Sequence, residues 1–347
     1  MHGGIDADLD DTFDIITRFS ARLDTRSKNM ASTDIVDYEP DIGDFRQGLV
    51  DGLKKEPKDI PAKFLYDERG SELFEQICDT DDYYPTRTEI AIMETCLDEV
   101  SELIGARARI VEFGAGSGRK TRMFLDALDT PAAYLPIEIS KAALRGCAER
   151  MRKAFPQLEI LPICADYTEP VELPEPSASF GRTVGYYPGS TLGNFEPDEA
   201  AAFLRRIRDL CGDDGGLVIG VDLVKDRETL EAAYDDSEGV TEAFTMNILD
   251  RANREADADF DRNGFEFEAE WQPDEQRVQL RLVSQRAQTV HIGETTVDFD
   301  AGEHVVTEHS YKFRLDQFAE LARETGFTPV EAWTDDEERF SLWYLET

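Results

Sequence analysis

The segment at residues 109–121 constrains the fold of this chain more than any other. A short apolar run ends in a glutamate, glycines then alternate at Gly114, Gly116 and Gly118, and helix-forming residues follow. This order predicts a buried strand that turns tightly into a helix, with bare backbone where a ligand can approach closely. A glycine-rich turn that holds no ligand is the alternative.

Two phosphate-binding motifs fit this segment poorly. The P-loop requires Gly-Lys-Ser/Thr in succession, but Arg119 separates Gly118 from Lys120. The dinucleotide fingerprint requires glycine where the chain has Arg119. The remaining pattern, E-x-G-x-G-x-G, is typical of S-adenosylmethionine-dependent methyltransferases, so we expect S-adenosylmethionine as the cofactor.

Strand-like and helix-like segments alternate from residue 107 onward. Expected strands cover residues 110–113, 134–139, 159–164, 183–187 and 216–221, and expected helices cover 120–128, 141–155 and 197–210. Such alternation predicts an α/β fold, a Rossmann-like class I methyltransferase sheet with helices on both faces. Ligands of such sheets bind beyond the carboxyl ends of the strands.

The alternation breaks between residues 228 and 312. A helix at 240–256 and strands at 264–271, 277–284, 288–292 and 305–313 predict an inserted lid, after which a helix at 315–325 and strands at 329–333 and 340–345 complete the sheet. The expected domains are an acidic, flexible extension at 1–44 that could hold a helix at 11–23, a helical segment at 45–106, the core at 107–227, the lid at 228–312 and the end of the core at 313–347. The segment at 45–106 and the lid would form a smaller α+β substrate-binding domain.

Two acidic residues lie where a bound cofactor would need them. Glu138 ends the second expected strand and could accept hydrogen bonds from ribose hydroxyls. Asp166 follows the third strand and could meet the adenine amine, with Tyr167 beside the ring. Either acid alone is also a common helix cap. Gly114 and Gly116 would receive the methionine end.

The charge balance limits the partners of the chain. It has 37 basic and 74 acidic residues and a formal net charge of −37, spread along the whole sequence. A generalised acidic surface suggests a halophilic protein, because salt screens its self-repulsion; an ordinary acidic cytosolic protein is the alternative. Nucleic acid is not an expected partner, since phosphate binding needs a basic face.

The five cysteines are scattered and the four histidines form no cluster with them. This predicts neither metal sites nor disulfides, and favours a reducing cytoplasm. The first residues lack the apolar core of a signal peptide, and no stretch approaches the ~20 apolar residues of a membrane span. We expect a cytoplasmic monomer that has small molecules, and no membrane, as partners.

Further sequence strings resemble one family, in which they occur in the same order. They read FLYDERGS at 64–71, YYPTRTE at 83–89, GRKTR at 118–122, PGSTLGNF at 188–195, GVDLVKD at 220–226, AYDD at 233–236 and TEHSYKF at 307–313. Together they resemble the histidine-specific N-alpha-methyltransferases of ergothioneine biosynthesis, from about residue 50 to the C-terminus. The resemblance implies three successive methyl transfers from S-adenosylmethionine to the α-amine of L-histidine, giving hercynine.

The resemblance also implies roles for individual residues. Family tyrosine and asparagine side chains hold the amino-acid head, and the matching positions are Tyr83, Asn194 and Tyr234. Tyr66 matches a tyrosine near the amine and the cofactor, where a phenol could order water or accept a proton. Tyr66, Tyr83 and Asn194 are therefore the candidate catalytic residues. Three further positions match binding residues of the family. Gly189 would let the backbone approach the substrate, Phe244 would form an apolar wall, and Lys120 would be a cofactor ligand.

The imidazole ring is recognised in the family by a glutamate and a serine that match Glu308 and Ser310. Residues i and i+2 of a strand face the same side, so both can enter one pocket. Leu280 stands where some relatives carry methionine near the ring. Without the resemblance, Glu308 and Ser310 could be the solvent face of a strand, residues 83–85 an aromatic turn, and Asn194 a helix N-cap.

Three other functions stay open at this point. The same scaffold could methylate another amino acid or a small amine. A non-catalytic S-adenosylmethionine-binding protein is a second possibility, although such a protein would not need residues that bind a substrate. A nicotinamide oxidoreductase fits least, given the broken dinucleotide fingerprint.

Overall fold

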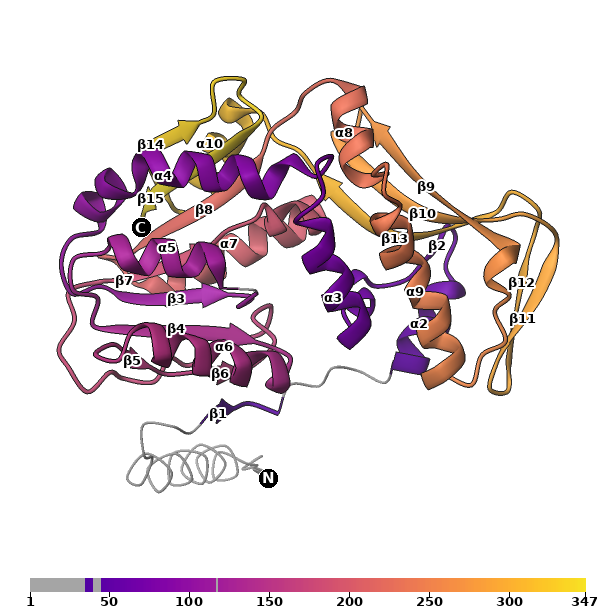
Figure 1. The fold of residues 1–347 in the computed structure, drawn as a ribbon, viewed down its shortest axis with the longest axis horizontal. Coiled ribbons are helices and arrows are strands. Elements are labelled where there is room, and N and C mark those ends of the chain that lie inside the picture. Colours follow the sequence, from indigo (N-terminus) through magenta and orange to yellow (C-terminus); the bar gives the residue numbers. More distant parts are fainter. Residues whose placement is uncertain (1–34, 40–44, 117) are drawn as a thin grey trace, which may run out of the picture.

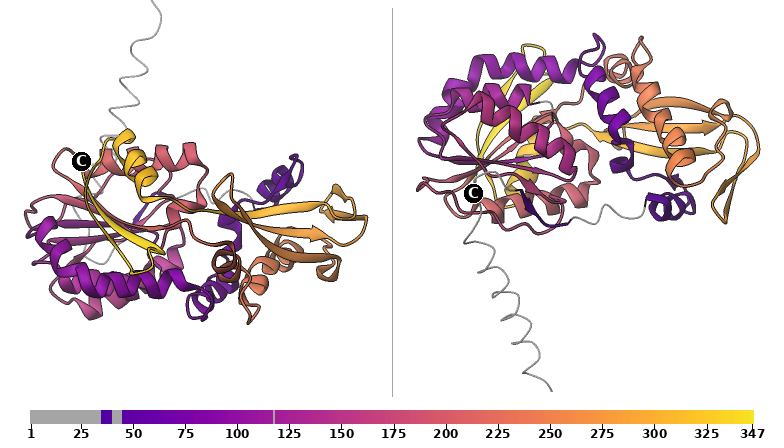
Figure 2. Two further views of the ribbon diagram at one scale, coloured as in Figure 1. Left: turned by 90° about the horizontal axis from the view of Figure 1, so that it is seen from above. Right: turned by 60° about the horizontal axis from the view of Figure 1, so that its bottom comes forward.

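The computed structural model describes residues 35–39, 45–116 and 118–347. The helix expected at 11–23 and most of the expected extension lie outside the described residues. The described chain forms two lobes, which lie side by side in Figure 1 and in both views of Figure 2.

A nine-stranded sheet forms the centre of the first lobe, in the order β1-β6-β4-β3-β7-β8-β15-β14 with β5 paired to β4. Its strands are β1 (Val36–Asp37), β3 (Arg109–Phe113), β4 (Ala133–Glu138), β5 (Glu159–Ile160), β6 (Ile163–Cys164), β7 (Thr183–Tyr187), β8 (Gly216–Asp222), β14 (Thr328–Thr334) and β15 (Phe340–Glu346). β15 pairs antiparallel with both neighbours, and the other pairs are parallel. The expected parallel sheet with a closing hairpin is confirmed.

Helices cover both faces of this sheet because its strands alternate apolar side chains to both sides. The helices are α4 (Tyr84–Ile104), α5 (Arg119–Ala127) and α6 (Lys141–Ala154) on one face, and α7 (Pro197–Cys211) and α10 (Leu315–Glu324) on the other. Within β3, Ile110 packs with the first group and Val111 with the second. The central strands are buried throughout, as expected where helices cover both faces.

The second lobe holds a smaller sheet in the order β2-β13-β10-β9, together with a two-stranded ribbon. Its elements are β2 (Lys58–Asp59), β9 (Phe265–Gln272), β10 (Arg277–Ser284), β11 (Gln288–Ile292), β12 (Thr295–Phe299), β13 (His304–Tyr311), the helices α2 (Phe45–Leu53), α3 (Glu68–Ile77), α8 (Arg227–Tyr234) and α9 (Val240–Glu255), and the short helices η1 (Ala62–Leu65) and η3 (Arg262–Gly264). One apolar core joins residues from positions 49–84 and 230–305. Segments far apart in sequence therefore share this core.

Four details differ from the sequence expectations. The third strand is split into β5 and β6 around Pro162, which has no N–H for a ladder bond. Strand β12 and helix α8 were not expected. Within the expected extension, Val36 pairs with Ile163, so β1 adds an edge strand to the main sheet. In the expected helical segment at 45–106, α4 packs on the main sheet, whereas α2 and α3 contact α9 in the smaller lobe.

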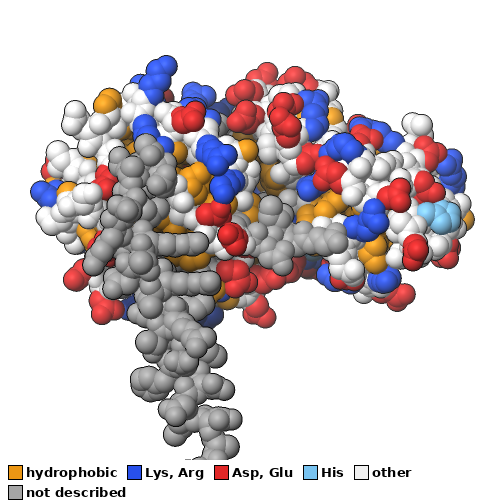
Figure 3. Space-filling view, turned by 90° about the horizontal axis from the view of Figure 1, so that it is seen from below, with side chains coloured by type: hydrophobic (Ala, Val, Ile, Leu, Met, Phe, Trp, Pro, Cys, Tyr) orange, Lys and Arg blue, Asp and Glu red, His pale blue; other side chains and the backbone are white. Residues whose placement is uncertain are grey.

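The described chain passes between the lobes at three places. These connections run from α3 to α4, from β8 to α8 and from β13 to α10 (Figure 1). None of the helices in the described ranges combines the length and hydrophobicity of a membrane span. Acidic side chains occur over both lobes on the face drawn in Figure 3.

Candidate active site

The glycine turn lies between β3 and α5, at the carboxyl end of the main sheet. Gly114 has a φ of 80°, in the region that favours glycine, and its N–H donates to the carbonyl of Ile137 at the end of β4. A Cβ added at Gly116 would meet no atom within 4 Å, and one added at Gly114 would approach only the ring of Tyr167. The turn therefore leaves open space beside its backbone.

The two expected cofactor acids end neighbouring segments of the sheet. Glu138 accepts the N–H of Ser140 through Oε1, and Asp166 accepts the N–H and hydroxyl of Thr168 through Oδ1. Glu138 also accepts from the backbone N–H of Ile139, and burial raises its pKa. A carboxylate has about four lone-pair sites, so both acids keep acceptor capacity that fits hydroxyl groups and an amine of a nucleoside.

The glutamate of the glycine motif has an internal role instead. Glu112 is buried and accepts hydrogen bonds from the hydroxyls of Thr121, at 2.8 Å, and Tyr134. Burial raises its pKa to about 7. These contacts tie β3 to α5 and β4, so Glu112 stabilises the turn from beneath.

Lys120 links the glycine turn to the segment that contains Gly189. Its ammonium lies 2.6 Å from the buried carboxylate of Glu89, which also accepts the N–H of Gly189 at 3.0 Å. Gly189 has a φ of 85°, and a Cβ there would lie 3.2 Å from Lys120 Nζ. The role of Lys120 as a direct cofactor ligand remains a prediction, since its charge is already paired. Glu89, on α4, was not singled out from the sequence.

Four aromatic side chains expected near the substrate amine lie in two pairs in the smaller lobe. The Tyr83 and Tyr234 rings are 6.0 Å apart, and the Tyr66 and Phe244 rings 5.3 Å apart, both edge to face. Tyr66 is 38% exposed, so water reaches it, yet protein surrounds its hydroxyl. This enclosure, with the nearby charge of Glu308 and the phenol of Tyr167, raises the pKa of Tyr66 well above its usual value.

Glu308 and Ser310 both lie buried on β13, facing the other candidate substrate residues. The Asn194 side chain, at the end of η2 (Thr191–Asn194), donates to Glu308 Oε1 at 2.7 Å. Ser310 Oγ lies 2.7 Å from the Tyr234 hydroxyl. Burial raises the pKa of Glu308 to about 7, and the charge of Lys312 offsets part of that rise.

The neighbours of this pair agree with the strand geometry. Leu280 on β10 is the cross-strand partner of Glu308 and is buried. His309, between the pair, turns to the opposite face, where it meets Glu196. The alternative of a solvent-facing strand is wrong for Glu308 and Ser310. The N-cap alternative for Asn194 is also wrong, because Glu196 caps α7.

A cluster of charges that sequence reasoning missed lies next to these residues. Asp222, at the end of β8, is buried and accepts hydrogen bonds from Tyr84, Lys225 and Lys312. The signal was present in the sequence, because Lys312 follows Ser310 by two positions and continues the same alternation. An aspartate that ends an apolar strand is a second such signal.

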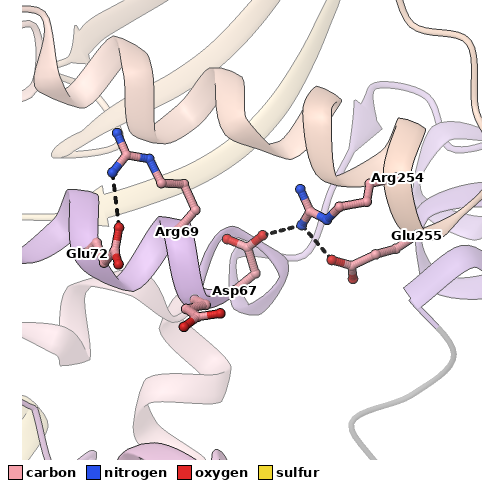
Figure 4. Close-up of a pocket in the computed structure, with 6 residues that line it drawn as sticks. Asp67, Arg69, Glu72, Arg254 and Glu255 are labelled. Atoms are coloured by element: carbon pink, nitrogen blue, oxygen red, sulfur yellow. Dashed lines mark hydrogen bonds and ion pairs between the residues drawn. The ribbon is translucent and has the colours of Figure 1, made fainter.

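A groove on the outer surface near Tyr66 is lined by paired charges (Figure 4). Arg254 contacts Asp67 and Glu255, each at 2.6 Å, and Arg69 contacts Glu72 at 3.1 Å. Asp67 also accepts the N–H of Gly70 and so caps α3. These contacts fix the backbone next to Tyr66.

Comparison with known proteins gives consistent matches. A family model described as "Histidine-specific methyltransferase, SAM-dependent" matches residues 45–347. The histidine N-alpha-methyltransferase of Mycolicibacterium smegmatis is 38% identical over 304 residues, covering 86% of this chain and 93% of that protein. The protein of the same name from Mycobacterium tuberculosis is 39% identical over 305 residues, with the same coverage. Ergothioneine biosynthesis protein 1 of Neurospora crassa is 28% identical over 288 residues, covering 81% of this chain and 32% of that protein.

Proposed function

Because the chain belongs to the family of histidine-specific, S-adenosylmethionine-dependent methyltransferases, we propose a role for each residue of its site in methylating L-histidine. The protein is a histidine N-alpha-methyltransferase of ergothioneine biosynthesis. We further propose that three methyl groups are transferred in succession to the α-amine of L-histidine, giving hercynine. The nicotinamide oxidoreductase considered from the glycine turn is not compatible with this family.

The cofactor residues are proposed from their free acceptors and open backbone. S-adenosylmethionine, when bound, supplies a methyl group on a positively charged sulfur. Gly114 and Gly116 receive its methionine end, Glu138 accepts from the ribose hydroxyls, and Asp166 accepts from the adenine amine. Tyr167, whose ring lies against Gly114, forms one wall.

The substrate amine has to be neutral and held in line with the methyl group, so positioning supplies most of the rate. We propose that Tyr83, Asn194 and Tyr234 hold the amino-acid head, with the backbone of Gly189 beside it. A phenol with a raised pKa is a poor base near neutral pH, so we assign Tyr66 to orienting the amine or a water molecule. The amine loses one proton to solvent before each transfer, so three protons leave over the three transfers, and the final quaternary ammonium carries none.

The buried carboxylate of Glu308, two residues from the Ser310 hydroxyl, is the observation that carries the choice of histidine. An imidazole ring offers one N–H and one acceptor nitrogen, which match a carboxylate and a hydroxyl. Phe244 and Leu280 provide the apolar surface around the ring. An apolar amino acid would leave the buried carboxylate with the Asn194 amide but without the second donor that an imidazole supplies, which is costly.

We also propose that the main sheet is a class I methyltransferase sheet, that the smaller lobe is the substrate-binding domain, and that the enzyme acts as a cytoplasmic monomer. All five cysteines are free, which agrees with a reducing compartment. Size-exclusion chromatography with light scattering tests the monomer.

A competition assay tests the substrate directly. Purified protein is incubated with S-adenosylmethionine, L-histidine and the other amino acids in high-salt buffer, and products are read by mass spectrometry. We expect a histidine product heavier by three methyl groups. Methylation of a different amino acid would overturn the pocket assignment while leaving the family intact. Cofactor binding without any methylation would favour a binding protein over an enzyme.

A further inference from the structure

The three connections between the lobes meet at one buried group of charges, here called the joint cluster: Tyr84, Asp222, Lys225 and Lys312. Tyr84 begins α4, Asp222 ends β8, and the two lysines follow β8 and β13. Both carboxylate oxygens of Asp222 lie 2.8 Å from the Tyr84 hydroxyl, and each lysine ammonium lies 2.7 Å from Asp222.

Lys312 reaches from this cluster into the substrate site. Its side chain is fully buried. Besides Asp222, its ammonium donates to the Tyr234 hydroxyl at 2.7 Å and to Ser310 Oγ at 2.8 Å. An ammonium group has three N–H donors and no acceptor, so these three contacts use its whole capacity. Both hydroxyl oxygens therefore act as acceptors toward Lys312.

The remaining protons of the two hydroxyls can be counted. Tyr234 and Ser310 each carry one O–H, and their oxygens lie 2.7 Å apart, so one of them donates to the other. One O–H is left over. Among the described residues no further hydrogen bond uses this O–H, so it is available to a bound substrate.

We propose that Lys312 is a positioning residue that fixes the hydroxyl protons of Tyr234 and Ser310, so that the pair meets the substrate as a hydrogen-bond donor. The inference rests on the proposed function and adds to it the form of the substrate. A donor from this pair matches the ring nitrogen that lacks a proton. Glu308 accepts from the ring nitrogen that carries one. The site then selects a neutral imidazole in one tautomer.

The chain offers a matched control for this role. Lys225 pairs with the same carboxylate and is only 8% exposed. It touches neither Tyr234 nor Ser310. Replacing either lysine by methionine removes one buried cation beside Asp222 at nearly constant volume. Only the Lys312→Met variant also removes the donor that orders the two hydroxyls.

The test compares kcat and KM for histidine, and the Kd for S-adenosylmethionine, in wild type, Lys312→Met and Lys225→Met. For Lys312→Met we expect KM to rise by about tenfold or more, with a smaller change in kcat and an unchanged cofactor Kd. For Lys225→Met we expect KM within about twofold of wild type. Equal KM values in both variants would overturn the proposal.

A second variant covers the case in which Lys312→Met does not fold. Asp222→Asn combined with Lys312→Met removes one buried charge of each sign, so the net charge of the cluster is unchanged, and Lys225 keeps the side-chain oxygen at position 222 and the carbonyl of Leu223 as acceptors. It should fold and keep the raised KM. If it folds with the KM of wild type, or if it also fails to fold, Lys312 is a structural residue and the proposal is wrong. A wild-type enzyme that does not methylate histidine would instead refute the proposed function.

Discussion

The side-chain amide of Asn194 donates a hydrogen bond to the carboxylate of Glu308, with 2.7 Å between Nδ2 and Oε1. Asn194 follows β7 in the main lobe, whereas Glu308 lies on β13 in the smaller lobe. The bond therefore crosses between the lobes. It joins a residue proposed for the amino-acid head to one proposed for the ring, so neither lobe contains the whole substrate site.

Replacing Glu308 by alanine should remove most of the preference for histidine. The acceptor for the ring N–H is lost, while the apolar surface of Phe244 and Leu280 stays. We expect kcat/KM for histidine to fall by about 100-fold, because a hydrogen bond to a charged group contributes ~1.5–3 kcal/mol. Other amino acids should lose much less in the competition assay. Glu308→Gln, which keeps an acceptor oxygen, is the control, and equal losses for all amino acids would contradict the assignment.

The stability of the protein should fall as the pH rises toward neutrality, in part because of Glu112. Burial raises its pKa from 4.5 to about 7, so the folded state binds this proton more tightly than the unfolded chain. The contribution is complete below the unfolded pKa and is lost as the pH rises through about 7. It amounts to at most about 3 kcal/mol.

Denaturant unfolding at about pH 5 and about pH 8 measures this change. Glu112→Gln keeps one acceptor oxygen for one of the two hydroxyls and offers an NH2 donor to the other, but it removes the titration, so its stability should depend less on pH. Glu308, whose pKa is also raised to about 7, and Glu138, whose pKa burial also raises, should supply part of the slope that remains. A variant with the same slope as wild type would argue against a raised pKa at Glu112.

Gly189→Ala should impair catalysis beyond its cost in stability. Gly189 and Gly302 have φ values of 85° and 82°, so alanine at either position costs roughly 1–2 kcal/mol. A Cβ at Gly302 would meet nothing within 4 Å, whereas one at Gly189 crowds Lys120. We expect similar losses of melting temperature but a drop of about tenfold or more in kcat/KM for Gly189→Ala alone. A matching drop in Gly302→Ala would point to general destabilisation.

Salt should stabilise the fold. The net charge of −37 produces self-repulsion that added salt screens. We expect the melting temperature to rise steadily in thermal scans from about 0.1 M to about 3 M KCl. Sucrose at equal osmolality controls for preferential exclusion. A melting temperature that does not change with KCl concentration would count against a halophilic protein.

Local patterns predicted most of the fold. The strand at 183–187 and those at 277–284 and 288–292 have the expected bounds, because alternating or continuous apolar runs between turn residues specify them. That Glu308 and Ser310 lie on the same face of their strand followed from the two-residue repeat of a β-strand alone. The split at Pro162 was harder to predict, because Pro136 lies inside β4 without dividing that strand.

The joint cluster could not be predicted in the same way. Asp222, Lys225 and Lys312 lie in segments that meet only after both lobes have formed, and no local period encodes that meeting. The packing of α4 on the main sheet likewise depends on tertiary contacts of its apolar face, which the local sequence does not specify. A charge inside an apolar strand signals a buried partner but does not identify it.

The shared core of the smaller lobe has a consequence for synthesis of the chain. Leu49, Leu53 and Leu73 on α2 and α3 pack in a core that takes most of its other members from positions 230–305. The ribosome produces these helices early, and the whole run of strands from β3 to β8 follows before their partners are made. The apolar faces of α2 and α3 stay uncovered during that interval, so both helices are translated long before they are buried, and rapid folding or chaperone binding protects the nascent chain from aggregation.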